Sequence, residues 1–188
     1  MKREINDKTI LDTFIIDFAS ILEKHCKYIV VSGFVAIAHG RSRGTEDIDI
    51  IIEKISKKKF INLFYELFDK GFECMQSQNP EVIYDRYLKQ KDSIRFVRKN
   101  EFLPEAELKF AKDELDEIQL KSRKKFPFTG LDIWFSNIEI NIAFKEELLK
   151  SKKDFEDSRH LRIIYKDEIS EEYINEIKKK IRKFRLKR

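Results

Sequence analysis

Two aspartates, Asp47 and Asp49, lie one residue apart inside the hydrophobic run EDIDIII. Residues i and i+2 of a strand point to the same face, so the two carboxylates are predicted to be neighbours. Their charges repel, and each loses hydration in a half-buried sheet. A divalent cation would offset both effects, and oxygen ligands suit Mg²⁺ or Mn²⁺ rather than zinc. A third carboxylate from another strand would complete a two-metal site for in-line phosphoryl transfer.

A potential phosphate site precedes the aspartates. The short strand YIVVS ends at Ser32-Gly33, and the segment GFVAIAHG is predicted to form a short helix. Glycine lets the backbone turn and approach a ligand, and free N–H groups at a helix start suit a triphosphate. The Ser32 hydroxyl adds a donor, and Arg41 and Arg43 could neutralise the same phosphates. His39 lies close to this loop but is expected to be structural.

A lone Asp-x-Asp is usually an exposed strand face, and a lone Ser-Gly is usually an ordinary turn. The joint pattern of strand, Ser-Gly, helix, Arg-bearing loop and acidic pair resembles the nucleotidyltransferase superfamily typified by DNA polymerase beta. The family signature is a hydrophobic residue, Gly-Gly or Gly-Ser, a spacer, and Asp-x-Asp flanked by hydrophobic residues. In this chain it reads Val31-Ser32-Gly33, then 34–46, then Asp47-Ile48-Asp49. The chain departs from the signature by having Ser-Gly in place of Gly-Gly or Gly-Ser.

Two stretches are similar to a small prokaryotic branch of that superfamily, which includes AbiEii-like toxins and minimal nucleotidyltransferases. The run RGTEDID matches the Arg-x-(Ser/Thr)-x-Asp-x-Asp motif of the branch, and IAFKEELLKSKKDFEDSRHL looks like its Lys-rich segment ending in K-D-x-x-D. The matched positions in the second stretch are Lys153, Asp154 and Asp157. The resemblance implies that Lys153 could reach a nucleotide phosphate, with Asp154 or Asp157 organising it or a water. Ion pairing on a solvated helix face is the alternative.

The third carboxylate has two candidates. In the family it lies on a later strand in a hydrophobic–Asp–hydrophobic context, which fits Glu107 and Asp132. Asp132 has the usual residue type, but its strand directly precedes a predicted C-terminal hairpin partner. Glu107 follows the predicted strand SIRFVRK in the order expected for the catalytic sheet, with Lys109 on the same face, and is favoured. A Glu there departs from the usual Asp.

The order of elements predicts an α/β (α+β) fold, a nucleotidyltransferase-like mixed sheet flanked by helices, with C-terminal helices packed on the core. We expect one domain over 1–188, with an N-terminal helix in 1–27, a catalytic core in 28–142 and C-terminal helices with a basic tail in 143–188. Predicted helices cover 8–25 (N-cap Asp7), 33–40, 56–70, 80–90, 113–124, 145–164 with a break, and 170–188. Predicted strands cover 28–32, 46–52, 72–75, 93–99, 106–112 and a hairpin over 130–144 around Ser136-Asn137.

Composition is globular, with 41% hydrophobic and 39% charged residues in a chain of 188. Residues 178–188 contain eight Lys or Arg, so removing them from the net charge of +5 leaves −3 on 1–177. This tail could contact RNA, DNA or another polyanion, although a solvated helix end is the more frequent explanation. No stretch is apolar enough to span a membrane, and Cys26 and Cys74 match no zinc or redox spacing. A cytoplasmic protein with reduced thiols is therefore expected.

The expected reaction is Mg²⁺-dependent (or Mn²⁺-dependent) transfer of a nucleoside monophosphate from an NTP to an acceptor hydroxyl. The predicted metal ligands are Asp47, Asp49 and Glu107, and the predicted triphosphate ligands are Ser32, Gly33 and Arg43. The acceptor would be RNA, particularly a tRNA end, or a protein side chain. The family likeness alone implies a toxin–antitoxin pair, so an antitoxin partner or a homo-oligomer is expected. The alternative is a catalytically degenerate module of the same fold that binds nucleic acid or a protein partner.

Overall fold

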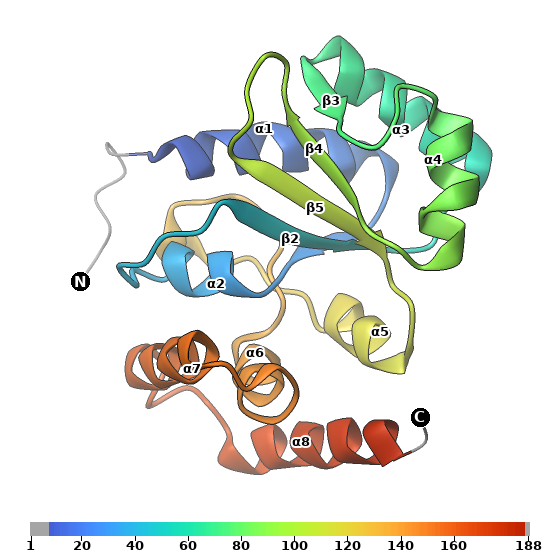
Figure 1. The fold of residues 1–188 in the computed structure, drawn as a ribbon. Coiled ribbons are helices and arrows are strands. Elements are labelled where there is room, and N and C mark those ends of the chain that lie inside the picture. Colours follow the sequence, from blue (N-terminus) through green and yellow to red (C-terminus); the bar gives the residue numbers. More distant parts are fainter. Residues whose placement is uncertain (1–7, 187–188) are drawn as a thin grey trace.

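A computed structural model describes residues 8–186 and contains one five-stranded sheet in the order β1-β2-β5-β4-β3 (Figure 1). Strands β2 and β5 pair in parallel, and every other neighbouring pair is antiparallel. The strands are β1 Tyr28–Val30, β2 Asp47–Ile52, β3 Phe72–Cys74, β4 Ile94–Arg98 and β5 Glu105–Phe110. The mixed sheet confirms the predicted fold class.

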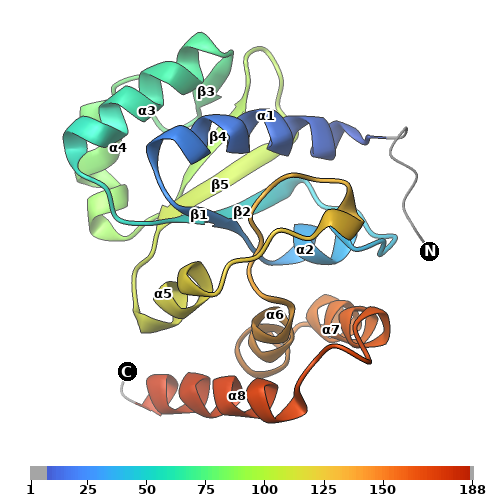
Figure 2. The same ribbon diagram turned by 180° about the vertical axis from the view of Figure 1, so that it is seen from behind.

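Eight α-helices surround this sheet in the described part of the chain. In both views α1, α3 and α4 lie together on one side, whereas α6, α7 and α8 form a layer below the β1–β2 side, with α2 and α5 between (Figures 1 and 2). A π-helical turn, Lys145–Leu149, continues α6. The helices are α1 Ile10–His25, α2 Gly33–Ala38, α3 Lys57–Asp69, α4 Pro80–Arg86, α5 Glu114–Lys121, α6 Ile138–Phe144, α7 Lys152–Ile164 and α8 Glu171–Leu186.

The alternating burial along β2 positions the acidic pair. Ile48, Ile50 and Ile52 are fully buried in the main core, while Asp47 and Asp49 lie half-buried on the opposite face. On that face, at the far end of the strand, Ile51 packs in a small cluster with Ile29, Val31 and Leu120. The carboxylate face of β2 is therefore closed at its C-terminal end and more open at the aspartates.

Most predicted elements appear close to the expected positions. Thr9 caps α1 by accepting from the backbone N–H of Asp12, whereas the predicted cap Asp7 lies outside the described residues. Asn79 and Pro80 open α4 as predicted, although this helix ends at Arg86 and only a 3₁₀ turn follows. The predicted break within the helix over 145–164 falls between the π-helical turn and α7.

The predicted hairpin over 130–144 is wrong. Its second half is helix α6, and its first half makes only isolated bridges, from Phe135 to Val30 and to Lys124. The sequence IEINIAF alternates in polarity like a strand. Because α6 is buried on nearly all sides, its polar and apolar residues do not separate into an exposed and a buried face, and the pattern does not reveal the helical period. Asn137, interpreted as a turn residue, caps the helix and accepts from the N–H of Glu139 at 2.8 Å.

Residues 178–186 of the basic tail form the C-terminal part of α8, and this helix packs against the molecule. Ile174, Ile177 and Ile181 are buried. Two of its cations lie within ion-pair distance of the π-helical turn, Lys178 Nζ 2.5 Å from Glu146 and Arg182 Nε 3.1 Å from Glu147. Part of the tail charge is therefore compensated by acids inside the fold, and Lys178 is not the solvated charge that was expected there.

The helices and the two cysteines can be compared with the expectations of no membrane span and of reduced thiols. None of the helices formed by residues 8–186 combines the length and apolar character needed to cross a bilayer. Cys26 and Cys74 are buried free thiols, and burial raises the pKa of both, that of Cys26 to about 12. Their positions fit the expectation of unreactive thiols.

His39 is fully buried at the end of α2, among aromatic rings that include Phe126 and Tyr165. Its Nδ1 lies 2.6 Å from the carbonyl oxygen of Val35, and His160 bonds to its backbone oxygen at 3.0 Å. Burial is the main reason that the pKa of His39 falls from 6.5 to about 4. The ring is therefore neutral in the folded protein near neutral pH.

This burial predicts an acid-sensitive contribution to stability. The unfolded chain takes up a proton on His39 below pH 6.5 and the folded chain only near pH 4, so stability falls as pH falls through this window. We expect His39 to account for a loss of up to about 3 kcal/mol. Urea unfolding of the wild type and of His39→Gln between pH 7.5 and 4.5 measures it. Equal pH slopes for the two proteins would contradict the assignment.

Candidate functional site

Three carboxylates converge on the open face of the sheet. Asp49 on β2 is the register partner of Glu107 on β5, and parallel partners point to the same face. One oxygen each of Asp47, Asp49 and Glu107 lies within 4.8 Å of the others, close enough to share metal ions. The Asp132 side chain is 89% exposed and pairs with Lys125 at 2.8 Å, so it is not part of this group.

The electrostatics of the cluster favour a bound cation. Burial, together with repulsion from Asp47 and Glu107, raises the pKa of Asp49, while a hydrogen bond from the Ser32 side chain opposes the shift. Thr45 Oγ1 donates to Asp47 Oδ1 at 2.9 Å and fixes that carboxylate. Oxygen-only ligands at these spacings fit Mg²⁺ or Mn²⁺, so the residues present suit the metals inferred from the sequence.

Arg95 on β4 is a neighbour of this cluster that the sequence prediction missed. Its Nη2 lies 3.2 Å from Glu107 Oε2, and its Nε lies 3.4 Å from Glu105 Oε2. Arg95 and Glu107 are register partners, which explains the contact. The available signal was the alternation of SIRFVRK, which turns Arg95 to the polar face of the sheet.

The Ser32-Gly33 turn lies beside the carboxylates, as its place between β1 and α2 requires. Ser32 has φ 63° and ψ −134°, a conformation that favours glycine. This explains why the family signature has Gly at the position of Ser32. At Gly33 an added Cβ would lie 2.9 Å from the nearest guanidinium nitrogen of Arg43, so glycine allows the arginine to approach closely.

A buried ion cluster attaches helix α7 to this turn. The carboxylate of Asp157 is fully buried, 2.7 Å from Arg43 Nη1 and 2.8 Å from Lys145 Nζ, and it also pairs with Arg41. Lys145 is itself 1% exposed and lies 3.3 Å from Asp154. Arg43 is therefore held between Gly33 and Asp157.

Lys145 also lines the space in front of Ser32, and the sequence prediction did not single it out. Its burial lowers the pKa of the ammonium group, while the nearby carboxylates of Asp154 and Asp49 oppose the shift. A lysine that directly follows the apolar run INIAF is the signal that could have found it, because such a charge needs buried partners.

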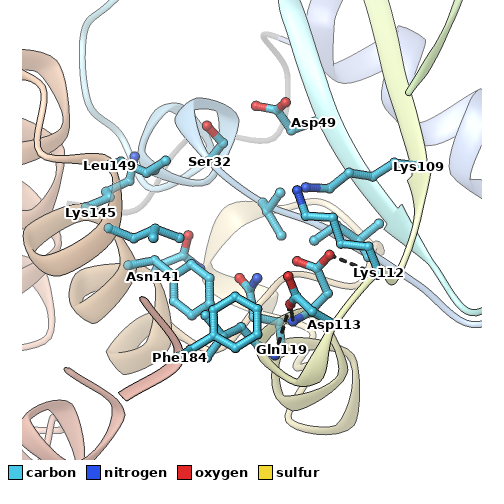
Figure 3. A pocket seen from close by; sticks show the side chains of 16 residues that line it. Ser32, Asp49, Lys109, Lys112, Asp113, Gln119, Asn141, Lys145, Leu149 and Phe184 are labelled. Carbon is cyan, nitrogen blue, oxygen red and sulfur yellow. Dashed lines mark hydrogen bonds between the residues drawn. The ribbon is translucent and has the colours of Figure 1, made fainter. Parts of the chain in front are cut away.

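Two cavities meet the acidic cluster, and they share no lining residue. The first, about 330 Å³, is lined at one end by Ser32, Asp49 and Lys145. Figure 3 shows Lys109 and Lys112 reaching into it from the opposite wall, with Gln119 and Phe184 at the far end. The second, about 560 Å³, is lined by Asp47, Arg43, Thr45, Arg95, Glu105 and Lys153, among others.

The predicted site residues thus separate into groups. Asp47, Asp49, Glu107, Ser32, Gly33 and Arg43 come together. Lys153 does not line the first cavity with Ser32 but the second one with Asp47. Of the paired acids, Asp154 closes the capping box of α7 and Asp157 forms the buried cluster. The roles of all these residues in binding remain predictions.

Neither a protein-family model nor a curated protein matches this chain. Among solved structures, ANT(2″)-Ia in complex with adenylyl-2″-tobramycin is 15% identical, with a TM-score of 0.57 over 93% of this chain and 98% of that chain. A solution structure of the antibiotic-resistance factor ANT(2″)-Ia is 14% identical, with a TM-score of 0.56 over 93% of this chain and 95% of that chain. An antigenic nucleotidyltransferase-like protein from Paracoccidioides brasiliensis is 20% identical, with a TM-score of 0.51 over 83% of this chain and 75% of that chain. At such identities the likeness establishes a nucleotidyltransferase-like fold.

The buried cluster predicts a strong dependence of stability on Asp157. In Asp157→Asn three largely buried cations lose their shared anion, so we expect the free energy of unfolding to fall by about 3 kcal/mol. The matched control is Glu156→Gln on the same helix, which loses an ion pair to Arg41 from a half-exposed side chain and should cost less than about 1 kcal/mol. Urea unfolding at pH 7 compares them, and equal losses would contradict the assigned role.

Proposed function

We propose that this protein is a metal-dependent nucleotidyltransferase, which moves a nucleoside monophosphate from an NTP to an acceptor hydroxyl and releases pyrophosphate. The observation that supports this most is the convergence of Asp47, Asp49 and Glu107, of which Asp49 lines a cavity of about 330 Å³ together with Ser32. The nucleotidyltransferase-like fold supports the same reaction class.

The three carboxylates would hold Mg²⁺ or Mn²⁺. When bound, the metal would neutralise phosphate charge and activate the acceptor oxygen. The raised pKa of Asp49 supports this assignment, because a cation would stabilise the charged form that burial and its neighbours disfavour. Glu107, at the position where the family has Asp, reaches the cluster with its longer side chain.

The first cavity would take the NTP. Ser32 and Gly33 would bind the triphosphate, with Arg43 held next to them by Asp157. Cations on two walls would balance the remaining phosphate charge, with Lys145 on one side and Lys109 and Lys112 on the other. The acceptor oxygen would attack the α-phosphorus, the bond to pyrophosphate would break, and the hydroxyl proton would be released.

The biological setting belongs to the proposal as well. The acceptor would be RNA or a protein side chain, in one cytoplasmic domain of 1–188 that pairs with an antitoxin or with a second copy of itself. The toxin–antitoxin role rests on the motif RGTEDID and on the segment that contains Lys153.

One observation favours the alternative, a degenerate module that binds nucleic acid or a protein partner. Glu107 replaces the usual Asp and lies in contact with Arg95, which neutralises part of the cluster without a metal. Under this alternative the cavities would bind ligands without transfer.

Transfer of radiolabel from α-labelled NTPs to extract RNA and protein, with and without Mg²⁺, separates the two functions. We expect Mg²⁺-dependent labelling that falls to background in Asp47→Ala, because the metals lose a ligand. The matched control is Asp132→Ala, an exposed carboxylate outside the cluster, which should keep wild-type activity. Absence of labelling by the wild type with all four NTPs would favour the binding module.

A further inference from the structure

Arg95 is the cation that contacts the acidic cluster. Among residues 8–186 no other Lys, Arg or His lies within ion-pair distance of Asp47, Asp49 or Glu107. Arg95 Nη2 lies 3.2 Å from Glu107 Oε2, and the register of β4 and β5 sets the two residues opposite each other. The hydrogen bond to Glu107, together with the charges of Glu105 and Asp47, raises the pKa of Arg95. The guanidinium therefore supplies part of the charge compensation that a divalent cation would supply.

A second acid is in place to hold this guanidinium. Arg95 Nε lies 3.4 Å from Glu105 Oε2, and Glu105 stands two residues before Glu107 on the same face of β5. Glu105 does not belong to the group of three carboxylates whose oxygens lie within 4.8 Å of one another. Arg95 thus bridges one candidate metal ligand and one acid outside the ligand group.

A divalent cation and Arg95 would compete for Glu107. Because Glu107 Oε2 accepts from Arg95, a metal ion at this carboxylate meets a reduced ligand charge and a like charge at close range. The pair can be broken at little cost, since the Arg95 side chain is 47% exposed and exposed ion pairs contribute little. Glu105 would keep the guanidinium after it leaves Glu107. The other nearby cation, Lys109, acts on Asp49 from beyond ion-pair distance.

We propose that Arg95 is a displaceable counter-ion of the metal site, which occupies Glu107 when no metal is bound and shifts to Glu105 when a divalent cation takes Glu107. The inference rests on the proposed function and adds control of its metal. Arg95 then lowers the affinity of the cluster for free Mg²⁺ or Mn²⁺, and it reduces the repulsion among the carboxylates in the metal-free protein. The exchange makes and breaks ion pairs only, and Glu107 has a cationic partner in both states.

The first test compares Arg95→Met with Arg98→Met. Arg98 is the matched control, because it lies on the same strand but pairs with Asp17 of α1. Mn²⁺ titration followed by electron paramagnetic resonance measures the dissociation constant, and urea unfolding verifies that both variants fold. We expect Arg95→Met to bind Mn²⁺ about tenfold more tightly than the wild type, and Arg98→Met to stay within about twofold of it.

A double-mutant cycle with Glu105→Gln tests the displacement. This change removes the second partner of Arg95, so Mn²⁺ must compete with a guanidinium held by Glu107 alone. We expect Glu105→Gln to weaken Mn²⁺ binding about tenfold in the wild type, but no more than about threefold in the Arg95→Met background, where only the lost charge acts. Equal factors in the two backgrounds would overturn the displacement to Glu105.

The outcomes for Arg95→Met separate this inference from the proposed function. Unchanged Mn²⁺ affinity, or the same gain in Arg98→Met, would overturn the inference while the metal site stands. Binding by Arg95→Met but not by the wild type would mean that Arg95 replaces the metal permanently, which overturns the exchange and favours the degenerate module. No binding by either protein, even with a non-hydrolysable NTP analogue, would reject the metal-dependent function and the inference with it.

Discussion

The repulsion among three carboxylates on neighbouring strands is the constraint around which this molecule is organised. Parallel pairing of β2 and β5 sets Asp49 opposite Glu107, and the two-residue period of β2 adds Asp47 to the same face. The isoleucines on the other face are fully buried, so this strand cannot shift its register by one residue without burying the acids. The sheet thus holds like charges together, and the raised pKa of Asp49 reports the cost.

The C-terminal helices turn this charged surface into a site. In the layer formed by α6, α7 and α8, Asn141 and Lys145 line one wall of the first cavity, and Lys153 lines the second. The cluster around Asp157 attaches this layer to the loop before β2, because Asp157 forms ion pairs with Arg41 and Arg43 of that loop. The same buried anion therefore stabilises the interface of the layers and orients the arginine beside Gly33.

Local patterns explain what could be predicted from the sequence. The alternation of β2, the Ser-Gly turn and the position of Glu107 all follow from periodicity and element order, which act over a few residues. The helix α6 was missed because its apolar residues are buried on several sides, so the pattern no longer indicates one period. Long-range packing decides the remaining contacts, which no local spacing encodes. It brings Asp157 to Arg43 and Lys145, and it brings Arg95 to Glu107.

Metal binding by the three carboxylates is the central claim, and a Mn²⁺ titration followed by electron paramagnetic resonance tests it most directly. The account predicts saturable Mn²⁺ binding that Mg²⁺ displaces, a loss of affinity of at least about tenfold in Asp49→Asn, and wild-type affinity in Asp132→Asn. Equal affinity in Asp49→Asn and the wild type, or no binding by the wild type even with NTP present, would contradict it.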